Sequence, residues 1–344
     1  MKIAAIPQKL LSRILTIMLQ LLPLEKLVDP FFRALNSRGK IFATYRKRFF
    51  GIREHSGDIP SLEYQFKKSD IGIILQGPIC HRQNFTYLTI IRYLHCFPGA
   101  QIVLATWESE KLEKFRKLSF DFPRLHILEL EKPSFPGPFN INYQICSTQA
   151  GLSKVQELNL EYVIKSRTDQ CLYDVFALDK LRNSLETSPP SLSESRIVFL
   201  SFNSFLFRLY GPSDMFQFGK TLQLVKYWDV SFDYRENMDA CLKPLSMRDY
   251  SREEICEVYI CANYLRALGF KLDFTMSQNL AIFRDLFIVL DAFDVELIWN
   301  KYTYDENRWA TEEFPHKNQE WNFAIWVNLD SQIEFLDGYD RFLD

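Results

Sequence analysis

The sequence lacks the glycine motifs that bind nucleotide phosphates in two large groups of enzymes. No GxGxxG follows the first predicted strand, and no GxxxxGK[ST] occurs anywhere in the 344 residues. Such motifs place backbone N–H groups around a pyrophosphate or a triphosphate. Their absence argues against a nicotinamide-type dinucleotide-binding enzyme and against a P-loop NTPase.

Cysteine and histidine spacing gives no sign of a metal site or of a disulfide framework. The seven cysteines are odd in number, and none of their spacings is typical of a zinc finger or a redox pair. None of the five histidines is spaced as a pair of metal ligands. We therefore expect reduced, mostly buried thiols in a reducing compartment.

The chain has almost no net charge, but its charge is unevenly distributed. The formal net charge is −2, so nothing in the whole chain indicates nucleic-acid binding. Residues 1–53 contain 11 Lys or Arg and two acidic residues, a net charge of +9, and the rest of the chain therefore carries −11. This asymmetry indicates that the N-terminal segment has a separate role.

Residues 10–28 are strongly apolar but do not form an uninterrupted apolar run. Two basic residues, a glutamate and a proline interrupt the run, whereas a bilayer-spanning helix needs about 20 nearly unbroken apolar residues. No small-residue cleavage site follows, as a signal peptide would require. An apolar face with a basic flank is typical of a helix at an anionic membrane surface. The alternative is a helical hairpin packed on the enzyme, with its basic residues solvated.

Apolar runs alternate with helical periodicity between residues 71 and 165. Continuous apolar runs predict buried strands, and apolar residues repeating every three or four positions predict helices. The alternation predicts an α/β fold with a parallel sheet covered on both faces, whose ligands bind at the carboxyl ends of the strands. The predicted strands are 71–75, 101–107, 125–130 and 162–165, and the predicted helices are 86–97, 110–118 and 142–159. Further along, residues 197–202 are predicted as a strand and 252–268 as a helix.

Arg167 and Asp169 follow the fourth predicted strand. Because side chains of a strand alternate with a period of two, these two side chains point to the same side. Arginine can hold a phosphate through two hydrogen bonds, and aspartate can hold a divalent cation between two phosphates or bind a sugar hydroxyl. The alternative is a structural Arg–Asp pair at the end of the strand.

Other polar residues allow two interpretations each. Asn140, Asn142 and Gln144 precede a predicted helix, and their amides can bind a nucleotide base or ribose or can cap the helix. Asp214 follows a Gly-Pro turn and can bind donor-sugar hydroxyls or begin a turn. Glu257 shares a predicted helix face with Glu253 and can act as a general base or have only a structural role.

Several sequence runs occur in an order that resembles a known family. IGIILQGPI, FPGAQIVLATWE, NINYQICSTQAGL and EYVIKSRTDQ are followed by SDMFQFG and EVYICANYL. With these motifs, residues 70–270 resemble the WavE-type lipopolysaccharide synthesis family. The resemblance implies a GT-A-like α/β fold with a mainly parallel central sheet flanked by helices, after an N-terminal helical segment. We expect that segment over residues 1–60 and the enzyme over 61–344, with a nucleotide-binding half over 61–187 and an acceptor half over 188–344.

The resemblance also implies an activity. We expect transfer of a sugar from a nucleotide-diphosphate donor to a lipopolysaccharide or capsule-type glycan, which is free or lipid-linked. The expected location is the cytoplasmic face of the cell membrane, contacted through residues 1–50. The first alternative is a phosphotransferase that moves phosphate or sugar-phosphate in the same pathway. The second is a non-catalytic glycan-assembly protein.

Site residues follow from the same resemblance. GT-A enzymes bind a divalent cation, here Mg²⁺ or Mn²⁺, with an Asp-x-Asp motif, and the matching positions make Asp169 the expected metal ligand. Arg167 replaces the first acid and could supply the positive charge of a metal. Glu257 is the expected acceptor-side base, Arg167 stabilises the leaving diphosphate and Asp214 orients the donor sugar. The expected donor-binding residues are Gln76, Gly77, Pro78, Thr106, Asn142, Arg167 and Asp169.

Overall fold

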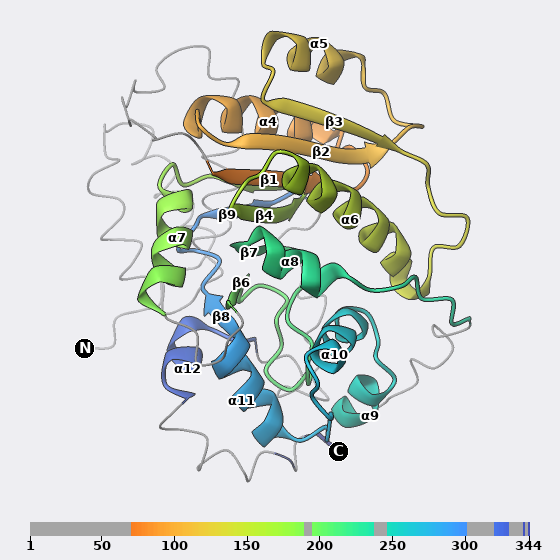
Figure 1. The fold of residues 1–344 in the computed structure, drawn as a ribbon, viewed down its shortest axis with the longest axis vertical. Coiled ribbons are helices and arrows are strands. Elements are labelled where there is room, and N and C mark those ends of the chain that lie inside the picture. The colour runs from red at the N-terminus through yellow and green to blue at the C-terminus, as the bar shows by residue number, and fades with distance from the viewer. Residues whose placement is uncertain (1–69, 189–194, 237–245, 301–319, 330–339, 341–342) are drawn as a thin grey trace, which may run out of the picture. The chain divides into compact units, whose positions relative to one another are not determined.

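The computed structural model describes residues 70–188, 195–236, 246–300, 320–329, 340 and 343–344 (Figure 1). The predicted helical segment over residues 1–60, including the expected membrane-surface residues 1–50, lies outside this part of the chain. Within it, no helix is both long enough and apolar enough to cross a membrane.

The described part contains a seven-stranded sheet with the order β3-β2-β1-β4-β7-β6-β8. Parallel pairing joins β3, β2, β1 and β4 in that order, and β6 to β8. Only β7 among these strands runs against its neighbours β4 and β6. The predicted α/β fold, with a mainly parallel central sheet flanked by helices, is confirmed. The strands are β1 (Ile71–Gln76), β2 (Gln101–Trp107), β3 (Leu125–Leu130), β4 (Tyr162–Arg167), β6 (Ile197–Leu200), β7 (Gln217–Lys220) and β8 (Phe287–Leu290).

Helices cover the sheet, and α6 and α8 lie side by side across it (Figure 1). Helix α6 packs on β1 and β2, α10 packs on α8, and α11 and α12 pack on β8. A separate antiparallel pair joins β5 (Gln170–Leu172) to β9 (Leu297–Trp299). The helices are α4 (Phe85–Cys96), α5 (Glu113–Asp121), α6 (Ile141–Glu157), α7 (Ala177–Thr187), α8 (Thr221–Trp228), α9 (Met247–Arg252), α10 (Glu257–Ala267), α11 (Met276–Leu286) and α12 (Phe323–Val327).

Two glycines allow α6 to approach β1 closely. A Cβ added to Gly72 would lie 2.8 Å from Val155 of α6, and one added to Gly151 would lie 2.6 Å from Ile74 of β1. These contacts also show which face of β1 is turned toward α6, because Gly72 and Ile74 are two residues apart. By the same alternation, Gln76 at the end of the strand points toward α6 as well.

The strands of the first half agree with their predicted ranges to within two residues, and its helices to within three. The prediction of one helix over 252–268 is wrong at its start, because α9 ends at Arg252 and α10 begins at Glu257. Between them, Glu254 and Cys256 have positive φ angles of 49° and 53°. The carbonyls of Glu253 and Glu254 accept hydrogen bonds from Arg235 instead of from helical N–H groups. Glu253 is therefore not on the helix of Glu257.

Candidate functional site

A pocket of about 330 Å³ lies at the carboxyl ends of β1, β2 and β4. The parallel sheet brings these three strand ends to one edge, where α/β proteins bind their ligands. The loop after β3 and the first turn of α6 complete the walls. The lining residues are Gln76, Gly77, Pro78, Trp107, Lys132, Phe139, Asn140, Tyr143, Gln144, Arg167, Thr168 and Asp169.

Strand register explains why residues distant in sequence meet here. Gln76 of β1 pairs with both Ala105 of β2 and Arg167 of β4, so β1 and β4 end at the same level, and β2 continues two residues further to Trp107. Beyond this level, the N–H of Thr168 donates to the carbonyl of Gln76 at 3.1 Å, and that of Gly77 donates to the carbonyl of Ala105 at 3.0 Å. Gly77 has a φ of 108°, which a residue with a Cβ adopts only with strain.

Arg167 and Asp169 form a two-pronged ion pair in the pocket wall. Nε of Arg167 donates to Oδ1 of Asp169 at 2.9 Å, and Nη2 donates to Oδ2 at 3.0 Å. The side chains are 20% and 12% exposed, so the pair is partly shielded from water and still reaches the pocket. Arg167 and Asp169 therefore form the structural pair that was one interpretation of the sequence, and both also line the candidate site, as the other interpretation predicted. The same guanidinium geometry that fits a carboxylate fits a phosphate.

Aromatic rings and a second cation form another part of the lining. Trp107 and Tyr143 pack edge to face, with ring centroids 5.7 Å apart. Nζ of Lys132 lies 4.4 Å from the centroid of the Tyr143 ring. The buried Oε1 of Gln144 has no hydrogen-bond partner among the residues that the structure describes. The pocket therefore offers flat apolar surface and an amide oxygen next to positive charge, as a nucleoside with a phosphate group needs.

Asp169 is a poor centre for a resident divalent cation. Both its carboxylate oxygens accept from Arg167, and a cation would have to displace that guanidinium. Within the described ranges, His, Cys, Asp and Glu side chains form no group of three or more that could hold a metal ion. Mg²⁺ needs an octahedral set of oxygen ligands. The donor groups described at this pocket do not fit the predicted Mg²⁺ or Mn²⁺ site.

Five predicted residues line the pocket together, namely Gln76, Gly77, Pro78, Arg167 and Asp169. Thr106 does not. It is fully buried, and the alternation along β2 places it on the sheet face opposite its neighbour Trp107, which contributes to the lining.

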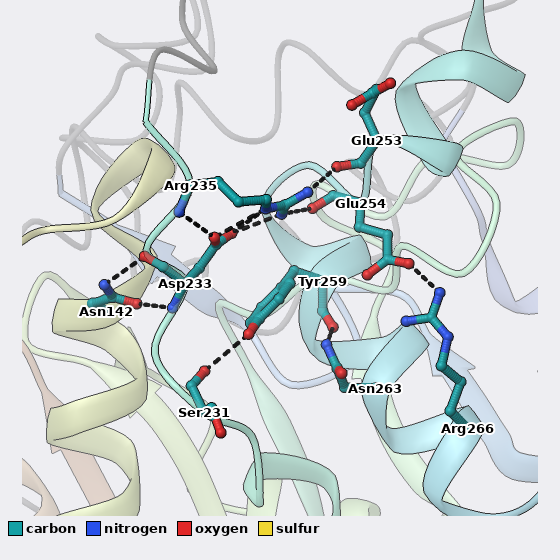
Figure 2. Close-up of polar contacts among 9 residues, drawn as sticks. All are labelled: Asn142, Ser231, Asp233, Arg235, Glu253, Glu254, Tyr259, Asn263 and Arg266. Atoms are coloured by element: carbon teal, nitrogen blue, oxygen red, sulfur yellow. Dashed lines mark hydrogen bonds and ion pairs between the residues drawn. The ribbon is translucent and has the colours of Figure 1, made fainter.

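Asn142 also lies outside the lining, although Asn140 and Gln144 belong to it. Asn140 and Gln144 are four positions apart and share one face, whereas Asn142 points to the opposite side of α6. Its buried amide bonds the backbone of Asp233 in both directions (Figure 2). Asn142 therefore holds the backbone at Asp233 in place and does not contact a ligand in the pocket.

Asp214 and Glu257 are buried and are not part of the pocket lining. Glu257 accepts from Nδ2 of Asn203 at 3.0 Å and from Nη1 of Arg208 at 3.1 Å. Burial raises the pKa of Glu257, while the positive charge of Arg208 opposes the rise. The main-chain oxygen of Asp214 accepts from the ammonium group of Lys165.

Lys165 connects these buried groups to the pocket. It lies two residues before Arg167 on the same face of β4, is fully buried, and has its Nζ 4.8 Å from the Trp228 ring centroid. Burial lowers the pKa of Lys165 to about 8, against the opposing charge of Asp214. The charge of Glu257 also acts on this group. One ammonium group is thus influenced by both the pocket and the Glu257 cluster.

Sequence reasoning missed part of the lining. Trp107 ends a predicted strand, and Tyr143 follows Asn142 at the start of α6. Their positions and their aromatic rings could have identified both as candidate ligand-binding residues. Lys132 and Phe139 come from the connection between β3 and α6, where no periodicity places a side chain. The fold brings this connection next to the strand ends, and Lys132 and Phe139 line the pocket for that reason.

Comparison with known proteins gives one family and several distant structures. A family model described as WavE lipopolysaccharide synthesis matches residues 71–284. No curated protein matches the chain.

The similar solved structures include three nucleotide-handling proteins. A protein described as a nucleotide-diphospho-sugar transferase from Desulfovibrio desulfuricans G20 shares 10% identity, over 78% of this chain and 98% of its own, with a TM-score of 0.34. The mannosyltransferase PcManGT from Pyrobaculum calidifontis, in complex with GDP-Man and Mn²⁺, shares 10% over 52% and 51%, with a TM-score of 0.29. A 4-diphosphocytidyl-2C-methyl-D-erythritol synthase shares 12% over 49% and 82%, with a TM-score of 0.32. Likenesses this distant do not identify a ligand for this chain.

Lys165 gives the stability of the fold a specific pH dependence. Between pH 8 and the ordinary lysine pKa of 10.5, the unfolded chain holds a proton that the folded chain has lost. The free energy of unfolding therefore rises with pH in this window, by up to about 1.4 kcal/mol per pH unit. Urea unfolding should show wild type gaining stability relative to K165M as pH rises from about 7 to about 9.5. If the difference in unfolding free energy between the two proteins stays constant over this range, the lowered pKa of Lys165 is wrong. The cysteines and tyrosines with raised pKa values are present in both proteins, so their titration cancels in this difference.

Proposed function

The chain belongs to the WavE lipopolysaccharide synthesis family, and from this premise we propose that it is a glycosyltransferase. It moves a sugar from a nucleotide-diphosphate donor to a lipopolysaccharide or capsule-type surface glycan. The observation that carries the proposal is the pocket at the ends of β1, β2 and β4, where Arg167 and Lys132 lie beside an aromatic wall.

The donor fits this pocket by size and by chemistry. A volume of about 330 Å³ is within the range of small-molecule sites. The base stacks on the rings of Trp107 and Tyr143, since every nucleobase has a flat face that aromatic side chains bind. The diphosphate lies toward Arg167, with Lys132 as a second cation. The N-terminal end of α6 adds the partial positive charge of its aligned peptide groups.

In the proposed reaction, the bond between the anomeric carbon and the diphosphate oxygen breaks, and its electron pair leaves with the diphosphate. An acceptor hydroxyl oxygen forms the new bond to the anomeric carbon and gives its proton to a base. Arg167 stabilises the charge that develops on the leaving oxygen. No step depends on a divalent cation, because the described donor groups do not fit one.

We assign the base to Glu257 and the orientation of the donor sugar to Asp214. Burial raises the pKa of Glu257, and so does the charge of Asp214, which suits a group that accepts a proton near neutral pH. The role requires the acceptor hydroxyl to replace Asn203 or Arg208 as the partner of the carboxylate.

We further propose that the enzyme works at the cytoplasmic surface of the membrane, where a lipid-linked acceptor would be found. Support comes from the sequence alone, in the net charge of +9 over residues 1–53 and the apolar run at 10–28. The full chain should sediment with vesicles that contain anionic phosphatidylglycerol, and far less with neutral phosphatidylcholine vesicles. Equal binding to both, or to neither, would contradict the proposal.

Nucleoside diphosphates should stabilise the folded protein without a divalent cation. In a thermal unfolding assay, a diphosphate at 100 times its Kd adds about 2.7 kcal/mol. We expect at least one of uridine, guanosine, cytidine or adenosine diphosphate to raise the melting temperature in the presence of EDTA. R167M should lose most of this shift, because the guanidinium that holds the diphosphate is gone.

The matched control is R116M, which removes an exposed arginine on α5 that pairs with Glu129 outside the pocket. It should keep the full shift. If EDTA abolishes the stabilisation and Mn²⁺ restores it, the metal-free assignment is wrong. If no diphosphate stabilises the wild type under either condition, the donor site itself is wrong.

Sugar transfer should depend on Asp169 and Glu257 in different ways. D169N should reduce transfer by at least about 100-fold, because Arg167 loses the carboxylate that orients it for transition-state stabilisation. E257Q should reduce turnover by about 100-fold or more while diphosphate binding stays intact, because Glu257 is the proton acceptor and does not line the donor pocket. D121N, which changes an exposed carboxylate on α5, is the control.

Mass spectrometry of the glycan product reads out these variants and the reaction type together. An added mass of one dehydrated sugar supports glycosyl transfer, whereas an added phosphate or sugar-phosphate would mean a phosphotransferase. Normal turnover in D169N, with its fold intact by circular dichroism, would remove Asp169 from the mechanism.

A further inference from the structure

Residues 231–235 form an extended strap between the first turn of α6 and the turn that precedes α10 (Figure 2). Figure 2 shows Asn142 on one side of this strap and the backbone of Glu253 and Glu254 on the other. The strap contributes no residue to the pocket lining. It is nevertheless fixed by an unusual number of buried or partly buried polar contacts.

A single amide side chain ties the strap to the segment that borders the pocket. Nδ2 of Asn142 donates to the carbonyl of Asp233 at 2.8 Å, and the N–H of Asp233 donates back to Oδ1 at 2.7 Å. The same Nδ2 also donates to the carbonyl of Phe135 at 3.2 Å. Because Asn142 is fully buried, loss of these bonds would leave unpaired polar groups in the interior. Asn142 thus holds the backbone of two separate aromatic-bearing segments at one place.

Arg235 fixes the other end of the strap. Its Nε and Nη2 donate to the carboxylate of Asp233 at 2.9 and 2.7 Å. Its Nη1 and Nη2 donate to the carbonyls of Glu253 and Glu254 at 2.6 and 2.9 Å. The hydroxyl of Tyr259 donates to the carbonyl of Ser231 at 3.2 Å. The backbone on both sides of residue 234 is therefore immobilised.

The residue presented by this rigid backbone is an open aromatic ring. Tyr234 is 68% exposed, and its ring stacks on Phe135 with centroids 6.0 Å apart and 21° between the planes. Phe232 packs against the same tyrosine at 6.4 Å. An exposed aromatic residue alone means little, but here the protein immobilises the backbone that carries it. A ring fixed in advance binds a ligand with less entropic cost than a mobile one.

Asn142 ties this aromatic pair to segments that also supply residues to the donor pocket. Phe135 lies in the connection that supplies Lys132 and Phe139 to the lining, and Asn142 lies next to the lining residue Tyr143. Phe139 is itself 39% exposed. The same connection between β3 and α6 thus carries an aromatic residue of the pocket lining, Phe139, and the partner ring of Tyr234, Phe135. An acceptor must approach from such a neighbouring surface, since its hydroxyl has to reach the anomeric carbon of the bound donor.

We infer that Tyr234, stacked on Phe135, binds a sugar ring of the acceptor glycan. One face of a pyranose carries C–H groups that pack flat on an aromatic ring, while its hydroxyls stay in water at the ring edge. A single exposed ring matches this shape, whereas a protein partner or an acyl chain would need a larger apolar area. The inference rests on the proposed function, because it takes the pocket as the donor site. Asn142 and Arg235 are then positioning residues for the acceptor.

Saturation-transfer NMR with deacylated bacterial lipopolysaccharide oligosaccharides tests this inference on the full chain. The probes are a set of core and O-antigen oligosaccharides freed of lipid, so binding to a membrane surface does not contribute. We expect wild type and Y234F to bind at least one of them, and Y234A to bind it at least tenfold more weakly. F120A, which removes an 88% exposed ring on α5, should bind as the wild type does.

Nucleoside diphosphate melting shifts, measured on the same proteins, separate this inference from the proposed function. Y234A should keep the full shift, which shows that its fold and donor site are intact. Equal oligosaccharide binding by Y234A and wild type would overturn the inference, and so would a wild type that binds diphosphate but none of the oligosaccharides. A concentration-dependent dimer that only Y234A loses would assign the surface to a second copy of the chain instead. Absence of any diphosphate shift in the wild type would reject the donor site on which both ideas rest.

Discussion

The register that β1 keeps with β2 and β4 is the constraint on which the rest of the site depends. Gln76 pairs with Ala105 on one side and with Arg167 on the other, so residues from three parts of the chain meet at one edge. Helix α6 packs closely on β1, at Gly72 and Gly151. Larger residues there would push α6 outward, and Tyr143 and Gln144 would move away from the strand ends with it.

Charge in the site is arranged in pairs. The guanidinium of Arg167 is compensated by Asp169, and the buried ammonium of Lys165 lies among the carboxylates of Asp214, Asp169 and Glu257. Isolated charges would be costly to bury; Arg167 is held by its ion pair with Asp169, and Lys165 donates to the main-chain oxygen of Asp214. In the proposed complex, the diphosphate binds the guanidinium that Asp169 orients, so donor binding depends on the conformation of the strand end. In the proposed reaction, Arg167 supplies the positive charge that stabilises the leaving diphosphate.

The strand ends of the site could be predicted from sequence, because hydrophobic runs locate buried strands and parallel sheets bind ligands at their carboxyl ends. Arg167 and Asp169 followed from these two rules, and the family resemblance added Gln76, Gly77 and Pro78. It was harder to predict which side of a strand or helix a single side chain lies on. Thr106 was predicted to bind the donor, but its neighbour Trp107 faces the pocket instead. Asn142 was predicted to bind the donor, but Asn140 and Gln144 face the pocket instead. In both cases the sequence located the end of the strand or the start of the helix. It did not predict which side chains face the pocket, because the rotation of the element about its axis depends on packing with distant segments.

The second half of the chain was less predictable for another physical reason. β7 is four residues long, ends in an exposed lysine, and runs antiparallel within an otherwise parallel sheet, so it has no long apolar run to mark it. The break between α9 and α10 depends on Arg235, which takes two carbonyls that a continuous helix would have used. Both features come from contacts between segments far apart in the sequence.

The most direct test of the account is a crystal structure of the protein with a bound nucleoside diphosphate. We predict that its phosphate oxygens lie within hydrogen-bonding distance of the Arg167 guanidinium, with the base against Trp107 or Tyr143. Electron density for the nucleotide at another place, with Arg167 turned away from it, would contradict the central claim.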